Sequence, residues 1–118
     1  MDEYLILMRL DLVTKEKQPS PEQLQEYMKM YHEWVDSIAA EDKFLGGKGL
    51  SPEGKVIRSK NVATDGPYAD IKESLAGFII VRAVDLDDAV RMAQACPILF
   101  DGANSVEVRK VATVHQQS

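Results

Sequence analysis

Two stretches of the chain, 3–12 and 75–84, alternate with the two-residue period of a β-strand. In the second stretch Ile79, Ile80 and Val81 are consecutive, so both faces of this strand are expected to be buried. In each stretch one row of side chains is wholly apolar, and we expect these rows to face the helices. They are Tyr4, Ile6, Met8, Leu10 and Leu12 in the first stretch, and Leu75, Gly77, Ile79, Val81 and Ala83 in the second.

Residues 20–42 carry the clearest periodic signal, with apolar side chains three and four positions apart, which predicts an amphipathic helix. Ser20 and Gln23 have the spacing of a capping box, and Pro21 suits the first helical position. Aromatic residues at this spacing are typical of a helix packed on a core rather than of an aromatic binding box. The stripe comprises Leu24, Tyr27, Met28, Tyr31, Trp34, Val35 and Ile38.

A second helix is predicted between Asp85, which can cap it, and Pro97, which stops it. Residues 44–50 and 55–63 are interpreted as the two strands of a hairpin, and 105–114 as the final strand. The order is therefore strand, helix, strand hairpin, strand, helix, strand. Two β-α-β halves around one sheet indicate a ferredoxin-like α+β fold, with an antiparallel sheet and both helices on one face.

The chain has 118 residues, close to the commonest size of one domain, so we expect a single domain over 1–114 and a frayed tail over 115–118. Two helices can cover one face of the sheet. The other face would expose an apolar patch that is unusual for a monomer. We therefore predict a symmetric homodimer with sheet face against sheet face, burying about 1,600 Å² or more in total. The alternative is a one-residue slip that reverses the faces of one strand. The outer rows are Leu5, Leu7, Ala76, Phe78 and Ile80, interrupted by Arg9, Asp11 and Arg82.

Composition limits the classes of partner. The net charge of −5 argues against nucleic acid, which needs a basic patch, and the 14 basic residues form no polybasic membrane anchor. The N-terminal sequence MDEYLILMRLDLV is acidic and its apolar run is interrupted, so we expect neither a secretory signal nor a membrane span. A single cysteine, Cys96, fits a reducing compartment, and a cytoplasmic location is expected.

Four segments, in order, carry a family resemblance: FLGGKGL at 44–50, ATDGPYADIKESLAGF at 63–78, DLDDA at 85–89 and SVEVR at 105–109. The chain resembles the YCII-related proteins that carry a DGPF motif. The departures are Tyr68 for the usual Phe, Ala76 for a Gly and Lys110 for a common Pro. The resemblance implies the dimeric α+β-barrel superfamily, whose members include isomerases, lyases that eliminate halide and cofactor-free monooxygenases. Fold-level analogy of this kind assigns no reaction.

His32 and Asp65 are the candidate catalytic residues. His32 flanks the buried stripe at roughly 105° from its centre, where it would either serve as an acid or base in a cleft or stay a half-exposed surface residue. YCII-related proteins resemble one another in pairing a histidine with an aspartate in a cleft. Asp65 would either orient His32 or bond the amides of its own turn.

The candidate ligand contacts are Arg9 and the turn residues Gly66, Pro67 and Tyr68. Arg9 interrupts an apolar face, so it should pair with Asp11, with a glutamate of the second subunit or with an anionic ligand; a bridge across the dimer is favoured over a bound organic acid. Two histidines and one cysteine provide no metal cluster of standard spacing, and no cofactor motif is found.

Two functions remain open at this point. The first is a cofactor-independent enzyme or binder of a small organic acid, of the lyase or isomerase type, with a His–Asp cleft. The second is a non-catalytic dimeric accessory or regulatory protein. A catalyst needs His32 and Asp65 within hydrogen-bond reach beside a pocket, whereas a scaffold needs neither.

Overall fold

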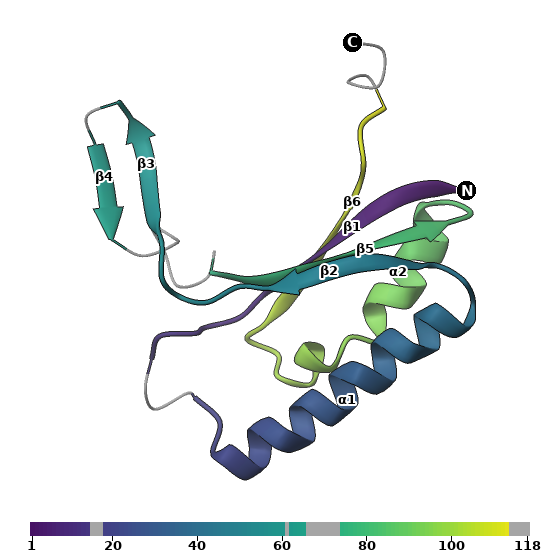
Figure 1. Cartoon of the computed structure of the whole chain (residues 1–118), viewed down its shortest axis with the longest axis horizontal. Coiled ribbons are helices and arrows are strands. Elements are labelled where there is room, and N and C mark those ends of the chain that lie inside the picture. The colour runs from purple at the N-terminus through teal and green to yellow at the C-terminus, as the bar shows by residue number, and fades with distance from the viewer. Residues whose placement is uncertain (15–17, 61, 66–73, 114–118) are drawn as a thin grey trace.

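The computed structural model of the chain describes residues 1–14, 18–60, 62–65 and 74–113, and for 62–65 the backbone alone. It contains six strands, two α-helices and one short 3-10 helix (Figure 1). In chain order these are β1 (Asp2–Arg9), α1 (Pro21–Ala40), β2 (Phe44–Gly49), β3 (Lys55–Ser59), β4 (Val62–Asp65), β5 (Leu75–Ala83), α2 (Leu86–Gln94), η3 (Pro97–Phe100) and β6 (Ser105–Lys110).

Four strands form one sheet in the order β2-β5-β1-β6, and each neighbouring pair is antiparallel. Both α-helices lie on the same side of this sheet (Figure 1). Leaving β3 and β4 aside, this is two β-α-β halves interleaved in one antiparallel sheet. The predicted ferredoxin-like α+β fold, with two helices on one face, is confirmed.

The core lies between the sheet and the helices. The rows predicted to face the helices are the buried ones, with Tyr4, Ile6 and Met8 of β1 at 3%, 0% and 4% exposure. Opposite them on β5, Ile79 and Val81 are fully buried and pair in register with Ile6 and Tyr4. This agreement confirms the assignment of faces from Tyr4 to Met8, where β1 and β5 pair in one register. The register shifts between Met8 and Arg9, which places Arg9 opposite Leu75.

The helices begin where the sequence predicts. Ser20 and Gln23 form the capping box, since Ser20 Oγ accepts from Gln23 N–H and Gln23 Oε1 accepts from Ser20 N–H. The Asp85 side chain caps α2 by accepting from Asp88 N–H at 2.9 Å. α1 ends two residues before the expected boundary, because Asp42 adopts a φ of 60° that a helix does not continue. In α2, Leu86 is half exposed, while Met92 is buried.

The expected hairpin between 44–50 and 55–63 is wrong. β2 pairs with β5, and the 55–63 stretch is divided into β3 and β4, which pair with each other as a separate two-stranded sheet. Gly47 of β2 allows this pairing, because a Cβ there would meet the Phe78 carbonyl oxygen at 2.5 Å. β3 and β4 rise on the side of the large sheet away from the helices (Figure 1).

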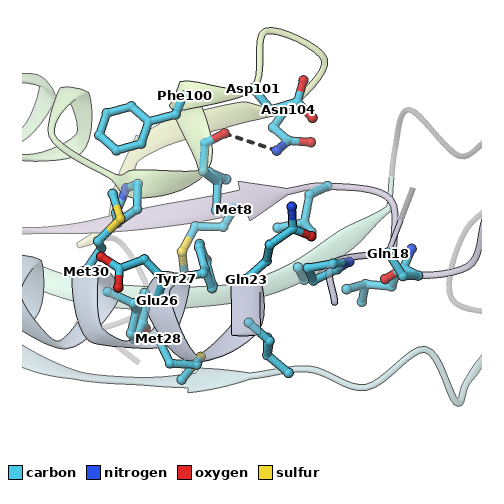
Figure 2. Close-up of a pocket in the computed structure, with 18 of the residues that line it drawn as sticks. Met8, Gln18, Gln23, Glu26, Tyr27, Met28, Met30, Phe100, Asp101 and Asn104 are labelled. Atoms are coloured by element: carbon cyan, nitrogen blue, oxygen red, sulfur yellow. Dashed lines mark hydrogen bonds between the residues drawn. The ribbon is translucent and has the colours of Figure 1, made fainter. Parts of the chain in front are cut away.

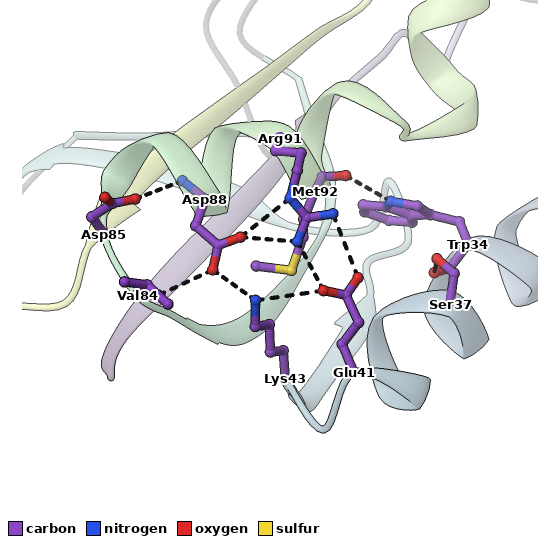
Figure 3. Close-up of polar contacts among 9 residues, drawn as sticks. All are labelled: Trp34, Ser37, Glu41, Lys43, Val84, Asp85, Asp88, Arg91 and Met92. Carbon is purple, nitrogen blue, oxygen red and sulfur yellow. Dashed lines mark hydrogen bonds and ion pairs between the residues drawn. The ribbon is translucent and has the colours of Figure 1, made fainter.

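Several polar contacts hold the helices to the sheet (Figure 3). Asp88 Oδ2 accepts from Lys43 Nζ at 2.8 Å and from Val84 N–H at 3.0 Å, and its other oxygen accepts from Arg91. These three donors hold the pKa of the Asp88 carboxyl well below its ordinary value of 3.8. The buried Trp34 indole of α1 donates to the Met92 carbonyl of α2 at 2.9 Å.

The outer face of the sheet carries the second apolar row. Leu5 stands opposite Ile80, and Leu7 stands opposite Phe78; all four are partly exposed within the single chain. The arginines that interrupt this face are paired inside the chain. Arg9 donates to Glu107 Oε1 at 2.9 Å, and Arg82 binds the Asp42 side chain.

Candidate functional site

A cavity of about 830 Å³ lies between the first half of α1, one end of the sheet and the segment 97–104 (Figure 2). We call it the α1 cavity. Its walls come from residues far apart in the sequence. They are Met8, Leu10, Leu12, Gln18, Pro19, Gln23, Leu24, Glu26, Tyr27, Met28, Met30, Tyr31, Gly49, Ala76, Pro97, Ile98, Phe100, Asp101 and Asn104.

Most of the lining is apolar, and its most exposed members show where the cavity opens. Met8 and Ile98 are 4% exposed and belong to the protein core, whereas Leu24 and Met28 on α1 are 48% and 39% exposed. Phe100 at the end of η3 is exposed as well. A compound that enters between α1 and η3 would therefore cover apolar side chains that are otherwise in water.

Three neutral amides line the cavity, and each is fixed by the backbone through one end. Gln18 Nε2 donates to the carbonyls of Asp11 and Thr14 at 3.0 Å, and Asn104 Nδ2 donates to the Ile98 carbonyl at 3.0 Å (Figure 2). Gln23 is fixed by the capping box. Among the described residues, the opposite atoms, Gln18 Oε1, Asn104 Oδ1 and Gln23 Nε2, have no hydrogen-bond partner. Because the backbone bonds orient each amide, these atoms are fixed acceptors and donors for a ligand.

Two tyrosines of the α1 stripe also face the cavity. The rings of Tyr27 and Tyr31 have centroids 6.4 Å apart, and Tyr31 meets the buried Trp34 edge to face at 5.8 Å. Burial is the main cause that raises the pKa of Tyr27 to about 12, and it raises the pKa of Tyr31 as well. Both phenols therefore stay protonated at neutral pH. The sequence assigned them to the core; they pack against it and also line the cavity.

Formal charge in the cavity lining is negative. Glu26 and Asp101 are the two ionisable carboxyls of the wall, and the described lining residues include no lysine, arginine or histidine. The Asp101 carboxylate accepts from Ala103 N–H at 3.0 Å, which shapes the 101–104 turn. The cavity is therefore an apolar space with neutral hydrogen-bonding groups and two carboxylates.

The predicted catalytic pair is not brought together within the described chain. His32 lies on α1, is exposed, touches the Tyr31 ring edge to face at 6.1 Å and is absent from the α1 cavity lining. Asp65 ends β4 rather than standing in a turn, and β4 lies across the sheet from α1 (Figure 1). The turn residues Gly66, Pro67 and Tyr68 lie outside the described residues.

Arg9 has a different partner from those expected. Its guanidinium meets Glu107 of the neighbouring strand in the same chain, with a second cation, Arg109, bound to the other carboxylate oxygen at 3.2 Å. Arg9 does not line the α1 cavity.

The segment 97–104 was missed as a site element. In the sequence, Pro97 was interpreted only as the residue that ends the second predicted helix. In the structure these residues form η3, whose Pro97 and Ile98 are buried while Phe100 is 78% exposed.

Metal and membrane features are absent from the part of the chain that the structure describes. Within it, no three His, Cys, Asp or Glu side chains are grouped so as to hold a metal ion. Neither described α-helix has the length and apolar composition needed to cross a bilayer.

Comparison with known proteins gives three findings. The sequence model of a family described as "YCII-related domain" matches residues 8–112. An uncharacterised protein of Rhizobium meliloti (strain 1021) is 28% identical over 88 residues, which are 65% of this chain and 71% of that protein. A similar solved structure is 5-chloro-2-hydroxyhydroquinone dehydrochlorinase from Burkholderia phenoliruptrix AC1100, in complex with 2,5-dihydroxybenzoquinone. Its TM-score is 0.52, with 17% identity and 93% of each chain covered. This last likeness concerns the fold.

Proposed function

The chain belongs to the YCII-related domain family, and on that premise we propose that it binds a small ring compound in the α1 cavity. We further propose that it acts on this compound as a cofactor-independent enzyme of the lyase or isomerase type. The observation that carries the proposal is the cavity itself. About 830 Å³ of largely apolar space with a few fixed polar groups is the usual composition of a small-molecule site.

The solved relative supports the class of ligand. That enzyme is described as a dehydrochlorinase and was solved with a dihydroxybenzoquinone bound. We carry over to this chain the idea of a small hydroxylated ring, because the α1 cavity combines apolar walls with hydroxyl and amide groups that such a ring would meet. The phenols of Tyr27 and Tyr31 would donate to its oxygens.

For the chemical step we propose His32 as the acid or base and Asp65 as the carboxylate that orients it, in a site that a second subunit completes, because His32 does not line the α1 cavity of its own chain. Because β4 and α1 lie on opposite sides of one sheet (Figure 1), this pair would form between subunits rather than within one. The exposure of His32 supports such a contact, since its ring is open to a second chain. Gly66, Pro67 and Tyr68 would follow Asp65 into the same contact. Arg9 is left out, because Glu107 already neutralises it.

The second subunit is itself part of the proposal. Leu5, Leu7, Phe78 and Ile80 form a continuous apolar centre on the outer sheet face, and a symmetric homodimer would cover it. The β3–β4 hairpin also supports a partner. Ile57 on it is 70% exposed, and two-stranded sheets are marginally stable on their own. A cytoplasmic location is proposed with it, consistent with a buried, unpaired Cys96.

One observation favours the second function, a non-catalytic dimeric accessory protein. The described lining of the α1 cavity includes no histidine, so a ligand there would meet no side chain that titrates near neutral pH. The two functions differ in the fate of a bound compound. An enzyme converts it, and an accessory protein returns it unchanged after long incubation, as followed by NMR.

Binding is tested by thermal shift against hydroxylated benzenes, quinones, lactones and small organic acids. A ligand at a hundred times its Kd stabilises the folded state by about 2.7 kcal/mol, which raises Tm by several degrees. Leu24→Trp should fill the cavity mouth and remove the shift. Leu86→Trp is the matched control, because Leu86 is an equally exposed helix leucine, 50% against 48%, away from the cavity. Equal shifts in both variants would exclude the α1 cavity as the site.

The dimer is tested separately by sedimentation. Wild type should sediment at twice 13.2 kDa, and Leu7→Lys, at the centre of the outer face, should give the single-chain mass. Val84→Lys adds the same charge at an exposed position just beyond β5 and should leave the dimer intact. A wild-type protein that stays at 13.2 kDa at micromolar concentration contradicts the dimer.

A further inference from the structure

The charges around the α1 cavity have a consequence for the kind of ring that it accepts. Within the described lining, the ionisable groups besides the two phenols are Glu26 and Asp101, both acidic. The whole chain carries a net charge of −5. Among the described lining residues a ligand carboxylate would therefore meet two like charges and no cation, which disfavours it relative to an uncharged group of the same shape.

For an uncharged ligand, the neutral groups of the cavity provide favourable hydrogen-bond partners. Gln18 and Asn104 each offer a carbonyl oxygen as an acceptor, and Gln23 offers an N–H₂ donor. Each amide is already oriented by a backbone hydrogen bond of 2.9–3.0 Å, so little rotamer entropy is lost when a ligand arrives. The phenols of Tyr27 and Tyr31 add hydroxyls that stay protonated. These groups match hydroxyl and carbonyl substituents on a ring.

We propose that the α1 cavity selects uncharged ring compounds that bear hydroxyl or carbonyl groups, and that it rejects the corresponding carboxylate anions. This inference rests on the proposed function, since it concerns the ligand of the same cavity. It differs from the small organic acid expected from Arg9, whose charge is used by Glu107.

The test compares two probes of the same shape, 4-hydroxybenzamide and 4-hydroxybenzoate, at neutral pH. The chain contains one tryptophan, Trp34, and its contact with the cavity residue Tyr31 makes its fluorescence a reporter of binding. The amide is expected to bind at least tenfold more tightly than the carboxylate. A carboxylate that binds within threefold of the amide, or more tightly, overturns the proposal.

A charge-reversal variant identifies the cause. Glu26→Lys places a cation on the cavity wall and should tighten binding of 4-hydroxybenzoate about tenfold, while the affinity for 4-hydroxybenzamide changes less than threefold. Glu33→Lys is the matched control, because Glu33 is exposed on the same helix and outside the lining. If Glu33→Lys tightens the carboxylate as much as Glu26→Lys does, the selection comes from the overall charge and the proposal is wrong.

The two proposals fail in different ways. If no uncharged or charged ring in the wider panel shifts Tm, and neither probe changes Trp34 fluorescence, the proposed function itself fails. If a carboxylate binds tightly and Leu24→Trp abolishes that binding, the cavity is a ligand site but its selection is the reverse of the one proposed here.

Discussion

The substitution Gly47→Ala tests how closely β2 packs against its neighbour β5. A Cβ at this position would lie 2.5 Å from the Phe78 carbonyl oxygen and 2.8 Å from Ile79 Cγ2. The oxygen belongs to the backbone of the central strand β5 and cannot rotate aside. Gly47→Ala must therefore push β2 away from β5, and forced shifts of this kind cost about 1–3 kcal/mol of folding free energy.

Gly49 on the same strand is the matched control, because a Cβ there meets no heavy atom within 4 Å. Gly49→Ala removes freedom from the unfolded chain and should stabilise by about 0.4–1 kcal/mol. The two variants should thus differ by about 1.5–4 kcal/mol, which separates their urea midpoints by on the order of 1 M. The assay is urea unfolding followed by circular dichroism, with all variants at the same protein concentration and without ligand.

Equal midpoints for Gly47→Ala and Gly49→Ala would refute the reasoning. They would mean that β2 does not approach β5 closely, and they would reopen the hairpin between 44–50 and 55–63 that the sequence alone suggested. A large loss in Gly49→Ala would also contradict it, since that position has open space.

Three further outcomes follow from the contacts of the helices. The pKa of Asp88 is depressed in the folded state, so its stabilisation is complete above its unfolded value of 3.8 and is lost as pH falls below it. Asp88→Asn should therefore lower stability at pH 7 and flatten the acid side of a Tm-against-pH curve, and an unchanged curve would show that the pair with Lys43 is unimportant. Trp34→Phe should cost about 1–3 kcal/mol in chemical unfolding, because it removes the buried hydrogen bond to Met92. Ser20→Ala should cost about 1 kcal/mol through the lost cap, and Ser20→Gly a few tenths; equal losses would contradict a capping role.

Local chemistry explains why the elements of this fold could be predicted. The buried row Tyr4, Ile6 and Met8 follows from the two-residue period of a strand, and the start of α1 follows from side chains that bond their own backbone at Ser20 and Gln23. Each of these signals lies within a few residues. The expected ferredoxin-like fold needed only their order along the chain.

Strand pairing could not be predicted in the same way, because it depends on contacts between distant segments. Residues 44–50 and 55–63 are neighbours in sequence and are joined by a turn, which favours a hairpin. In the structure β2 instead pairs with β5. The absence of a side chain at Gly47 makes that approach possible, but two adjacent glycines equally fit a bulge or a loop.

The candidate site shows the same limit. The α1 cavity joins residues of α1, of the end of β1 and of the segment 97–104, and no single motif contains them. Tyr27 and Tyr31 were visible as members of a helical stripe, but spacing cannot separate a side chain that packs on the core from one that also borders a cavity. His32 and Asp65 were chosen from a motif and from residue chemistry; their pairing stays a prediction.

The two arginines of the outer sheet face show why charge on such a face is a poor guide to a partner. A desolvated guanidinium needs an acceptor, so the sequence favoured a bridge to the second subunit. Both arginines instead bind a carboxylate of their own chain. Glu107 stands diagonally across from Arg9 on β6, and Asp42 lies just after α1 beside Arg82. The centre of the outer sheet face, which includes Leu5 and Phe78, can therefore contact a second subunit only through apolar side chains. The proposed dimer should then depend on buried apolar area, and its dissociation constant should change little between 0.1 and about 1 M salt. A steep weakening with salt would instead place these arginines in bridges between the subunits.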